Sequence, residues 1–321
     1  MDDQTDVACW KKVTSSYRRV EGLFLIFVAG LINVVVFSTV KLFPHLPVGQ
    51  FTATIYFYTF LFLTAAYCFC HQKLTFKSKA HFLFFRIVFG GIGGFLKLWS
   101  LRTLNYGDAV ALISLSSVFA TLFSRIVWKE KINVFTLIAL IMGLAGAVLV
   151  SQSPYIFTGE ANHDSLTKER KDFDLVQLMM PLGAALILGV GFSFMRGIGS
   201  DIPAELIGAA VSGVSSLSGV ISLLVIRQEY VCPTQVERAC LVLGGLGMAF
   251  SLGLLNRGLA IEQSGPGLLA KKLDIVTAYT IQVLFFGVVP TVLSGTGVML
   301  ILVGTLVVST NRFICTNSHM F

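Results

Sequence analysis

The sequence predicts an all-α membrane protein with ten transmembrane helices in two inverted five-helix repeats. Apolar residues make up 55% of the 321 positions and charged residues only 13%, whereas soluble domains average roughly 45–50% and 25%. Apolar runs of about 20 residues, the length that crosses a bilayer as a helix, recur along nearly the whole chain. Several short sequences of the first half also return in the second half. These observations predict a chain that is embedded in a membrane almost throughout.

Five apolar runs fill the first half. Residues 1–20 are polar and are expected to form a cytoplasmic tail. The apolar stretch behind them is longer than the core of a signal peptide and has no small-residue cleavage site after it, so we expect it to stay attached as the first span. Hydropathy places the five spans near residues 21–43, 51–70, 82–104, 108–128 and 132–151, and together they form the first repeat, 21–151.

A polar linker and five further apolar runs make up the second half. Residues 152–174 are rich in charges and turn formers, and such a segment does not enter lipid unpaired. The following spans are expected near residues 175–195, 204–226, 239–259, 265–286 and 291–310. They form the second repeat, 175–310, and residues 311–321 are expected to be a cytoplasmic tail.

Three landmarks indicate that the two halves are copies, because they recur at a nearly constant shift of 154 to 158 positions. The paired sequences are Leu46-Pro47 with Ile202-Pro203, Gly90-Gly91-Ile92-Gly93 with Gly244-Gly245-Leu246-Gly247, and GAVLVS at 146–151 with GTLVVS at 304–309. An odd number of spans per copy reverses the second copy in the membrane. The prediction is therefore an inverted repeat, the arrangement that supports alternating access around a central site.

Lysine and arginine placement predicts the orientation. If the N-terminus is cytoplasmic, the cytoplasmic segments hold more of these residues than the opposite side, and both termini are cytoplasmic. The formal net charge of +7 then reflects topology, with basic loops that contact anionic membrane lipid rather than nucleic acid. The sequence does not distinguish the plasma membrane from an endomembrane such as the endoplasmic reticulum or Golgi.

Charged residues inside the third span are candidates for a binding site. Arg86 and Lys97 lie within the apolar run, where each charge at the bilayer centre costs about 2.5–3.5 kcal/mol on insertion scales. At 100° per residue, one side of a helix collects Arg86, Gly90, Gly93, Gly94 and Lys97. This stripe is expected to face protein or water, with the alternative that Arg86 extends to the cytoplasmic interface.

The ninth span carries the second charged group. Lys271 and Asp274 are three residues apart and are expected to pair, while Lys272 has no obvious partner in its own helix. Gln282 continues the face of Asp274. In the first span, Asn33 either contacts a ligand or bonds a neighbouring backbone. Because cations outnumber anions in these spans, a solute with a carboxylate or phosphate would be favoured, unless Lys271 and Asp274 form only a packing pair.

Sequence motifs of enzymes are missing. The chain has no HExxH, GxSxG or P-loop motif, its five histidines form no metal pattern, and its six cysteines have no CxxC spacing. We therefore expect no enzyme activity, no catalytic residues, no metal and no cofactor.

Residues 101–112 (LRTLNYGDAVAL), 118–122 (VFATL) and 128–131 (WKEK) resemble the third-to-fifth-span signature of EamA-type proteins in the drug/metabolite transporter superfamily. Counterparts in the second half are 256–260 (NRGLA), 264–267 (SGPG) and 282–287 (QVLFFG). The resemblance covers roughly residues 21–310, which makes 21–151 and 175–310 two EamA repeats, and the chain is most similar to the member G branch of the solute carrier 35 group. It implies ten spans, cytoplasmic termini and a central cavity for organic solutes.

Several family charges are absent from their usual places, among them the arginine expected near Thr54 or Ile55 and its counterpart after Pro203. Gln50 stands where relatives commonly have an acid, and the position near Gly287 is neutral, whereas Glu205 and Glu130 keep their acids. A substrate site that depends on the missing charges is therefore not carried over.

The sequence as a whole predicts a secondary carrier or facilitator of small organic solutes, specifically organic anions such as di- and tricarboxylates. Lys97, Lys271 and Lys272 would attract the anion, and Asp274 would orient Lys271 or titrate during coupling. A nucleotide-sugar carrier and an adaptor that binds another membrane protein are the alternatives. The expected partners are a small-molecule solute and membrane lipid, with a homodimer or a membrane-protein partner left open.

Overall fold

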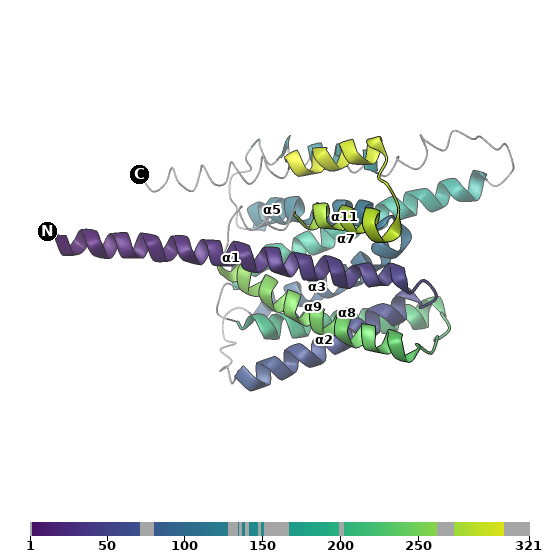
Figure 1. The fold of residues 1–321 in the computed structure, drawn as a ribbon, viewed down its shortest axis with the longest axis horizontal. Helices are drawn as coiled ribbons and strands as arrows, with labels where there is room; N and C mark the ends of the chain where they lie inside the picture. The colour runs from purple at the N-terminus through teal and green to yellow at the C-terminus, as the bar shows by residue number, and fades with distance from the viewer. Residues whose placement is uncertain are drawn as a thin grey trace.

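The protein is a bundle of α-helices in a computed structural model (Figure 1). The structure describes residues 2–70, 80–127, 134, 137–138, 141–146, 149–150, 167–198, 202–261 and 273–304. These residues form helices joined by short connections, and none of them forms a strand. The predicted all-α class is confirmed for this part of the chain.

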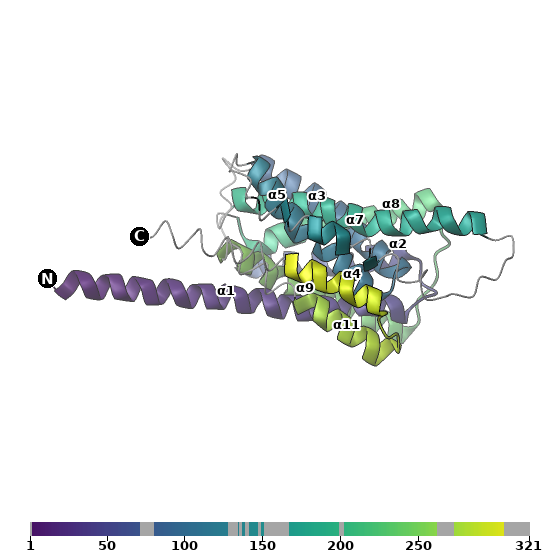
Figure 2. The same ribbon diagram turned by 90° about the horizontal axis from the view of Figure 1, so that it is seen from above.

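The first-half helices are α1 (Asp2–Leu42), α2 (Val48–Cys70), α3 (Ala80–Thr103), α4 (Tyr106–Ser114) and α5 (Ser116–Val127). The first turns of α1 extend well beyond the bundle in Figures 1 and 2, so this helix begins before the predicted first span. Isolated helical residues between 134 and 150 fall in the predicted fifth span.

The second-half helices are α7 (Thr167–Ile198), α8 (Ala204–Ile226), α9 (Gln235–Ile261), α11 (Leu273–Phe286) and a last helix at 292–304. The helix α7 begins inside the segment expected to be a linker, and it carries Pro181 in its interior. Residues 152–166 and 262–272 lie outside the described part, as do the C-terminal residues 305–321.

Within the described residues, six helical segments are long and apolar enough to cross a membrane: Phe24–Leu42, Val48–Cys70, Ala80–Thr103, Tyr106–Ser124, Ala204–Ile226 and Gln235–Leu259. Three shorter apolar helices accompany them at Met179–Met195, Asp274–Phe286 and Val292–Gly304. Several segments of bilayer-spanning length identify a multi-pass membrane protein. The full count of ten spans stays a prediction.

The predicted fourth span is broken at Leu115, which separates α4 from α5. The backbone N–H of Leu115 donates to Leu112 O at 3.1 Å, and the next turn repeats this tighter spacing. Two serines flank the break and bond back to the main chain, Ser114 to Ala111 O and Ser117 to Ser114 O. Serine hydroxyls that compete for helix carbonyls in this way bend helices, which explains why hydropathy alone did not reveal the break.

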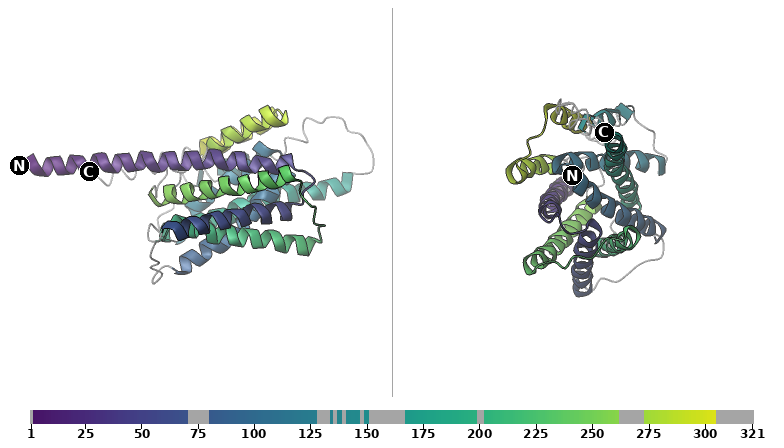
Figure 3. Two further views of the ribbon diagram at one scale, coloured as in Figure 1. Left: turned by 60° about the horizontal axis from the view of Figure 1, so that its bottom comes forward. Right: turned by 90° about the vertical axis from the view of Figure 1, so that its right-hand side faces the viewer.

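Helices of one half pack mainly on helices of the other. The helix α1 lies against α9, α2 against α8 and α9, and α3 against α7 and α8, and Figure 3 shows the helices end-on around a common centre. The largest buried cluster accordingly joins residues from both halves, such as Phe37, Ile55, Leu98, Ala209 and Leu252. The two halves therefore share one core.

Individual contacts also recur between the halves. Ser215 Oγ in α8 donates to Gly91 O in α3 at 3.0 Å, and Thr59 Oγ1 in α2 donates to Gly245 O in α9 at 3.2 Å. Ser215 follows Thr59 by 156 positions and Gly245 follows Gly91 by 154. The same backbone bond, made by the same small polar group, therefore joins the second and third helices of opposite halves twice.

Glycines let α2 and α8 approach closely. A Cβ atom added to Gly219 would lie 2.6 Å from Ala53 N and 2.8 Å from Gly49 O, and one added to Gly49 would lie 2.9 Å from Gly219 O. These neighbours are backbone atoms, which do not yield as side chains do. All members of the small-residue stripe of α8 are buried, as expected for helix packing: Gly208, Ser212, Ser215, Gly219 and Ser222.

We predict that Gly219→Ala destabilises the protein by roughly 1–3 kcal/mol, the usual cost of overpacking a close contact. Gly213→Ala on the same helix is the matched control, because its Cβ would meet only the ring of Phe60, at 3.5 Å. Thermal unfolding of the detergent-solubilised protein measures both variants. Equal midpoints for the two variants would contradict the close contact.

Candidate functional site

A central cavity of about 100 Å³ lies between α1, α3, α4, α7, α8, α9 and α11, and Tyr56 of α2 and Ser116 of α5 also line it. The α1 wall consists of Ile26, Ala29, Gly30, Asn33, Val34 and Phe37. These positions repeat at three and four residues, which is one face of a helix. The cavity is lined mainly by apolar side chains, with a few polar and charged groups among them, as is usual for small-molecule sites.

The predicted stripe of α3 forms the facing wall. Arg86, Gly90, Gly94 and Lys97 line the cavity, whereas Gly93 packs against Leu188 of α7. Four of the five stripe positions therefore come together at the cavity, and two of these four are cations. A Cβ atom added to Gly94 would lie 2.8 Å from Ser215 Oγ and 3.0 Å from the Tyr56 hydroxyl, so this glycine permits close contact with α8 and α2.

Arg86 lies inside the bundle, because only 2% of its surface is exposed. Its guanidinium carbon stands 5.0 Å from the centroid of the Phe192 ring, and its Nε has no hydrogen-bond partner. A Cβ atom added to Gly90 would lie 2.5 Å from Arg86 Nη1. The guanidinium therefore occupies the gap that Gly90 leaves, and the alternative of an arginine extended to the interface does not describe this structure.

Lys97 stands at the other end of the stripe. Its Nζ donates to Asn33 Oδ1 at 2.7 Å and lies 4.0 Å from the centroid of the Phe37 ring. The amide nitrogen of Asn33 in turn donates to Ser251 Oγ at 3.3 Å, and Ser251 donates to Ala29 O at 2.8 Å. Asn33 therefore links a cavity cation to α9.

Asp274 lines the cavity from the first turn of α11 and is partly buried. A side-chain atom added to Gly30 would overlap its carboxylate, so α1 and α11 approach each other at this point. Lys271 and Lys272 lie outside the described residues. The predicted pair of Lys271 with Asp274 therefore stays a prediction.

Gln282 has a different place from the one expected. Its Oε1 accepts from Gly107 N at 2.6 Å and its Nε2 donates to Val288 O at 3.2 Å. The residue is buried and is not among those that line the central cavity. Spacing along α11 gave the right helix face, but the neighbour on that face is the start of α4, so Gln282 fastens two helix ends and is removed from the candidate site.

Sequence reasoning missed the two phenylalanines and a buried acid. Phe37 follows Asn33 by one helical turn, which was a usable signal, whereas nothing in the sequence linked Phe192 to Arg86. Asp108 of α4 accepts hydrogen bonds from Tyr279 and Ser294, so its buried carboxylate has partners. No group of three His, Cys, Asp or Glu side chains suited to a metal occurs in the described ranges.

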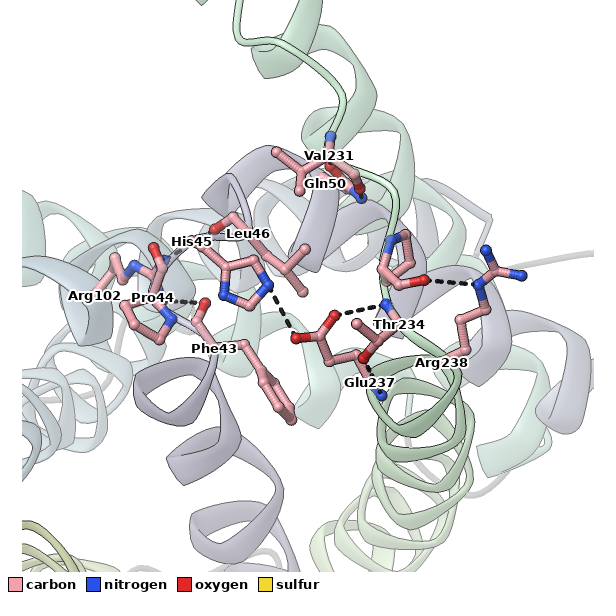
Figure 4. A network of polar contacts seen from close by, with 11 residues as sticks. Phe43, Pro44, His45, Leu46, Gln50, Arg102, Val231, Thr234, Glu237 and Arg238 are labelled. Carbon is pink, nitrogen blue, oxygen red and sulfur yellow. Dashed lines mark hydrogen bonds and ion pairs between the residues drawn. The ribbon is translucent and has the colours of Figure 1, made fainter.

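A polar network covers the end of the bundle where α1 and α3 finish, which we call the clamp end (Figure 4). Arg102 donates to carbonyl oxygens of the α1–α2 connection, and His45 Nε2 lies 2.9 Å from Glu237 Oε1 at the start of α9. The four carbonyls that Arg102 binds are those of Val40, Phe43, Pro44 and Leu46. The network therefore fastens this end of α3 to the connection between α1 and α2.

Gln50 belongs to the same network. Its Nε2 donates to Val231 O at 2.6 Å and its Oε1 accepts from Val231 N at 3.0 Å. The neutral amide both donates to and accepts from one residue of the α8–α9 connection, which a carboxylate cannot do. This contact explains how glutamine serves at a position where an acid was expected.

The opposite end of the bundle, where α3 begins and α7 finishes, has an ion pair of its own. Arg257 near the end of α9 contacts Glu205 in the first turn of α8. Arg257 follows Arg102 by 155 positions. Each half therefore uses one arginine to hold the start of a helix, with carbonyls at the clamp end and a carboxylate at the other.

Residues 20–152 match the model of the EamA-like transporter family. The resemblance to EamA-type proteins is confirmed. The matched segment contains α1 to α5, and with them Asn33, Arg86 and Lys97.

Curated proteins similar to this chain include two named solute carrier family 35 member G1. The mouse protein is 26% identical over 243 residues, which cover 74% of this chain and 65% of the relative. The human protein is 26% identical over 238 residues, which cover 72% and 64%. The similarity to the member G branch is confirmed, and the chain spans just under two thirds of the length of these relatives.

A solved crystal structure aligns with 88% of this chain and 98% of its own, with a TM-score of 0.58 at 17% sequence identity. At this identity the likeness concerns the fold alone. It shows that the helical arrangement described above also occurs in an experimentally determined protein.

We predict that Arg102→Gln lowers the free energy of unfolding by roughly 2–3 kcal/mol, because carbonyls of the α1–α2 connection lose a charged donor. Arg238→Gln is the control, since Arg238 is exposed and binds only local groups, Pro233 O and Cys232 Sγ. Thermal unfolding in detergent compares the two. A larger loss in the control would show that the clamp does not hold the end of the bundle.

Proposed function

We propose that this protein is a secondary transporter, a carrier or facilitator, of small organic solutes, and that its substrates are organic anions such as di- and tricarboxylates. One observation carries the substrate class. A buried guanidinium, that of Arg86, lines the central cavity, and its Nε has no hydrogen-bond partner. A buried cation without a full set of partners favours a ligand that brings a negative charge.

The similar proteins support a transport role. The family model that matches the first half is that of EamA-like transporters, and the relatives are named as solute carriers. A cavity at the centre of a membrane helix bundle is the place where transporters bind their substrates. An enzyme function has no comparable support.

Helix packing supports the proposed ten spans in two inverted repeats. Contact of α1 with α9 corresponds to contact of α7 with α3, and contact of α2 with α9 corresponds to that of α8 with α3. The pairs α2 with α8 and α4 with α11 join a helix to its own counterpart. Exchanging the halves maps these contacts onto themselves, as a two-fold axis between inverted repeats requires.

Close contact between the two last helices of the halves agrees with this arrangement. A Cβ atom added to Gly146 would lie 2.5 Å from Gly297 O, and one added to Gly297 would lie 2.6 Å from Gly146 O. The proposed fifth and tenth spans thus meet through reciprocal glycines. Because basic residues are in excess on one side of the membrane, we propose that both termini are cytoplasmic. The proposed location is the plasma membrane or an endomembrane.

The proposed binding residues are Arg86, Lys97, Asn33 and Asp274, all on the cavity wall. Lys271 and Lys272 belong to the proposal through their closeness to Asp274 in the sequence. Arg86 would bind the anion directly. Asp274 would offset part of the cationic charge, or carry a proton during coupling.

A nucleotide-sugar carrier is the second candidate. The aromatic rings of Phe37 and Phe192 stand beside the two cations, and a nucleotide offers a base for an aromatic surface and phosphates for the cations. This chemistry fits the same cavity.

We predict that proteoliposomes with the purified protein take up labelled citrate, and that Arg86→Gln combined with Lys97→Gln lowers uptake at least about tenfold, because the anion loses both cations of α3. The variant Lys271→Ala/Lys272→Ala tests the remaining lysines in the same way. Arg227→Gln is the control, because it removes the same charge at an exposed position at the end of α8.

A nucleotide sugar is offered in parallel. Uptake of the nucleotide sugar alone would replace the proposed substrate class with the second candidate. Uptake of neither compound by folded wild-type protein would reject the transport proposal for both classes and favour the adaptor function.

A further inference from the structure

Two cation–ring pairs occupy the cavity, and each takes its cation from α3. The guanidinium of Arg86 lies over the ring of Phe192 in α7, and the ammonium of Lys97 lies over the ring of Phe37 in α1. Aromatic faces attract cations, and the attraction grows where water is excluded. Both cations are thus held against a wall of the cavity by a ring from a neighbouring helix.

The internal repeat relates the two rings to each other. Phe192 follows Phe37 by 155 positions, the same shift that relates Arg257 to Arg102. The cations are not repeated, because the shift of 154 that relates the glycines of α3 to those of α9 leads from Arg86 to Cys240 and from Lys97 to Ser251. Each half of the repeat therefore supplies one of the two aromatic rings, whereas both cations come from α3.

The two pairs stand at opposite ends of the cavity. Arg86 and Lys97 are eleven residues apart, which corresponds to about 16 Å along a helix. Lys97 is nearer the clamp end, where α1 and α3 finish, and Arg86 is nearer the end where α3 begins and α7 finishes. The guanidinium reaches the level of Gly90, and the backbone levels of Gly90 and Lys97 are seven residues, or about 10 Å, apart along the helix.

The guanidinium of Arg86 keeps a donor without a hydrogen-bond partner, its Nε. A guanidinium that rests on a ring uses its face, while its N–H groups point outward in the plane and fit a carboxylate or phosphate with two parallel hydrogen bonds. The unpartnered Nε is one of these N–H groups. Gly90 and Gly191 border the guanidinium, and a Cβ atom added to Gly191 would lie 3.5 Å from Nη1.

Lys97 is engaged differently. Its ammonium carries three donors, one of which bonds Asn33 Oδ1. An anion at this end adds to or exchanges with the present contacts of the ammonium, and Asn33 remains linked to α9 through Ser251. The two cations therefore differ in how easily they bind an anion, since Arg86 has an unpartnered donor at Nε and Lys97 already has polar contacts.

We propose that the cavity contains two anion subsites, Arg86 on Phe192 and Lys97 on Phe37, which bind the same carboxylate or phosphate group in succession from opposite ends. This inference rests on the proposed transport of organic anions and specifies how the anion crosses the cavity. The Lys97 subsite receives solute from the clamp end, and the Arg86 subsite receives it from the opposite end. The anionic group moves from one cation to the other inside the cavity that both cations line.

The test measures citrate transport from each end separately. Proteoliposomes hold the full chain in one orientation, in a variant in which five of the six cysteines are replaced by serine and only Cys232 is kept. Cys232 is exposed and lies in the α8–α9 connection at the clamp end. Labelling of Cys232 with an impermeant maleimide establishes the orientation. We expect Lys97→Gln to raise the half-saturating citrate concentration about tenfold from the clamp end and less than about twofold from the opposite end. We expect Arg86→Gln to do the reverse.

The rings provide a second pair of variants that keep both charges. Phe37→Leu and Phe192→Leu should each raise the half-saturating citrate concentration a few fold at the end where the neighbouring cation lies, because that cation loses its contact with the aromatic ring. Equal effects of Arg86→Gln and Lys97→Gln at both ends would indicate one shared site and overturn the proposal.

Calorimetric titration of detergent-solubilised protein with citrate separates this inference from the proposed function. Two subsites predict that each single variant still binds citrate and that the variant lacking both cations does not. Wild-type protein that binds in this pattern without transporting citrate would reject the transport function and keep the subsites. Wild-type protein that binds no citrate, or a single variant that abolishes binding, would overturn the subsites.

Discussion

Two positive charges inside an apolar bundle are the constraint on which the rest of the cavity depends. Moving Arg86 and Lys97 away from water is costly unless neighbouring groups take over from solvent. The described structure meets this cost with two aromatic faces, one amide and a row of glycines. None of these groups is an anion, which is why the function proposed above assigns the balancing negative charge to the solute.

Close helix packing makes that arrangement possible. The helix α3 carries the cations because glycines on its other positions let α7 and α8 come near: Gly91 packs on Val214 and Gly93 on Leu188. Hydrogen bonds from Ser215 and Thr59 to glycine carbonyls then fix the pairs of helices without any hydrophobic driving force between them. Packing and binding thus use the same helix, with one face for each.

The sequence predicted the helical class, the positions of most spans and the cavity stripe, because hydropathy and a 100° spacing describe a single helix well. Arg86 and Lys97 were found for that reason. Phe192 was missed because its contact with Arg86 depends on how α7 packs against α3, which no spacing within one helix reveals. Gln282 was misplaced for the same reason, and the break at Leu115 depends on serine bonds that hydropathy does not record.

The two ends of the bundle show that the internal repeat preserves the position of an arginine but not the groups that the arginine binds. Arg102 and Arg257 stand at matching positions, yet Arg102 binds four neutral carbonyls whereas Arg257 binds the carboxylate of Glu205. The Arg257 side chain is 55% exposed, so salt screens this pair, while hydrogen bonds to carbonyls at the clamp end depend far less on ionic strength. Arginines at matching positions of the repeat therefore hold the two ends through different kinds of contact.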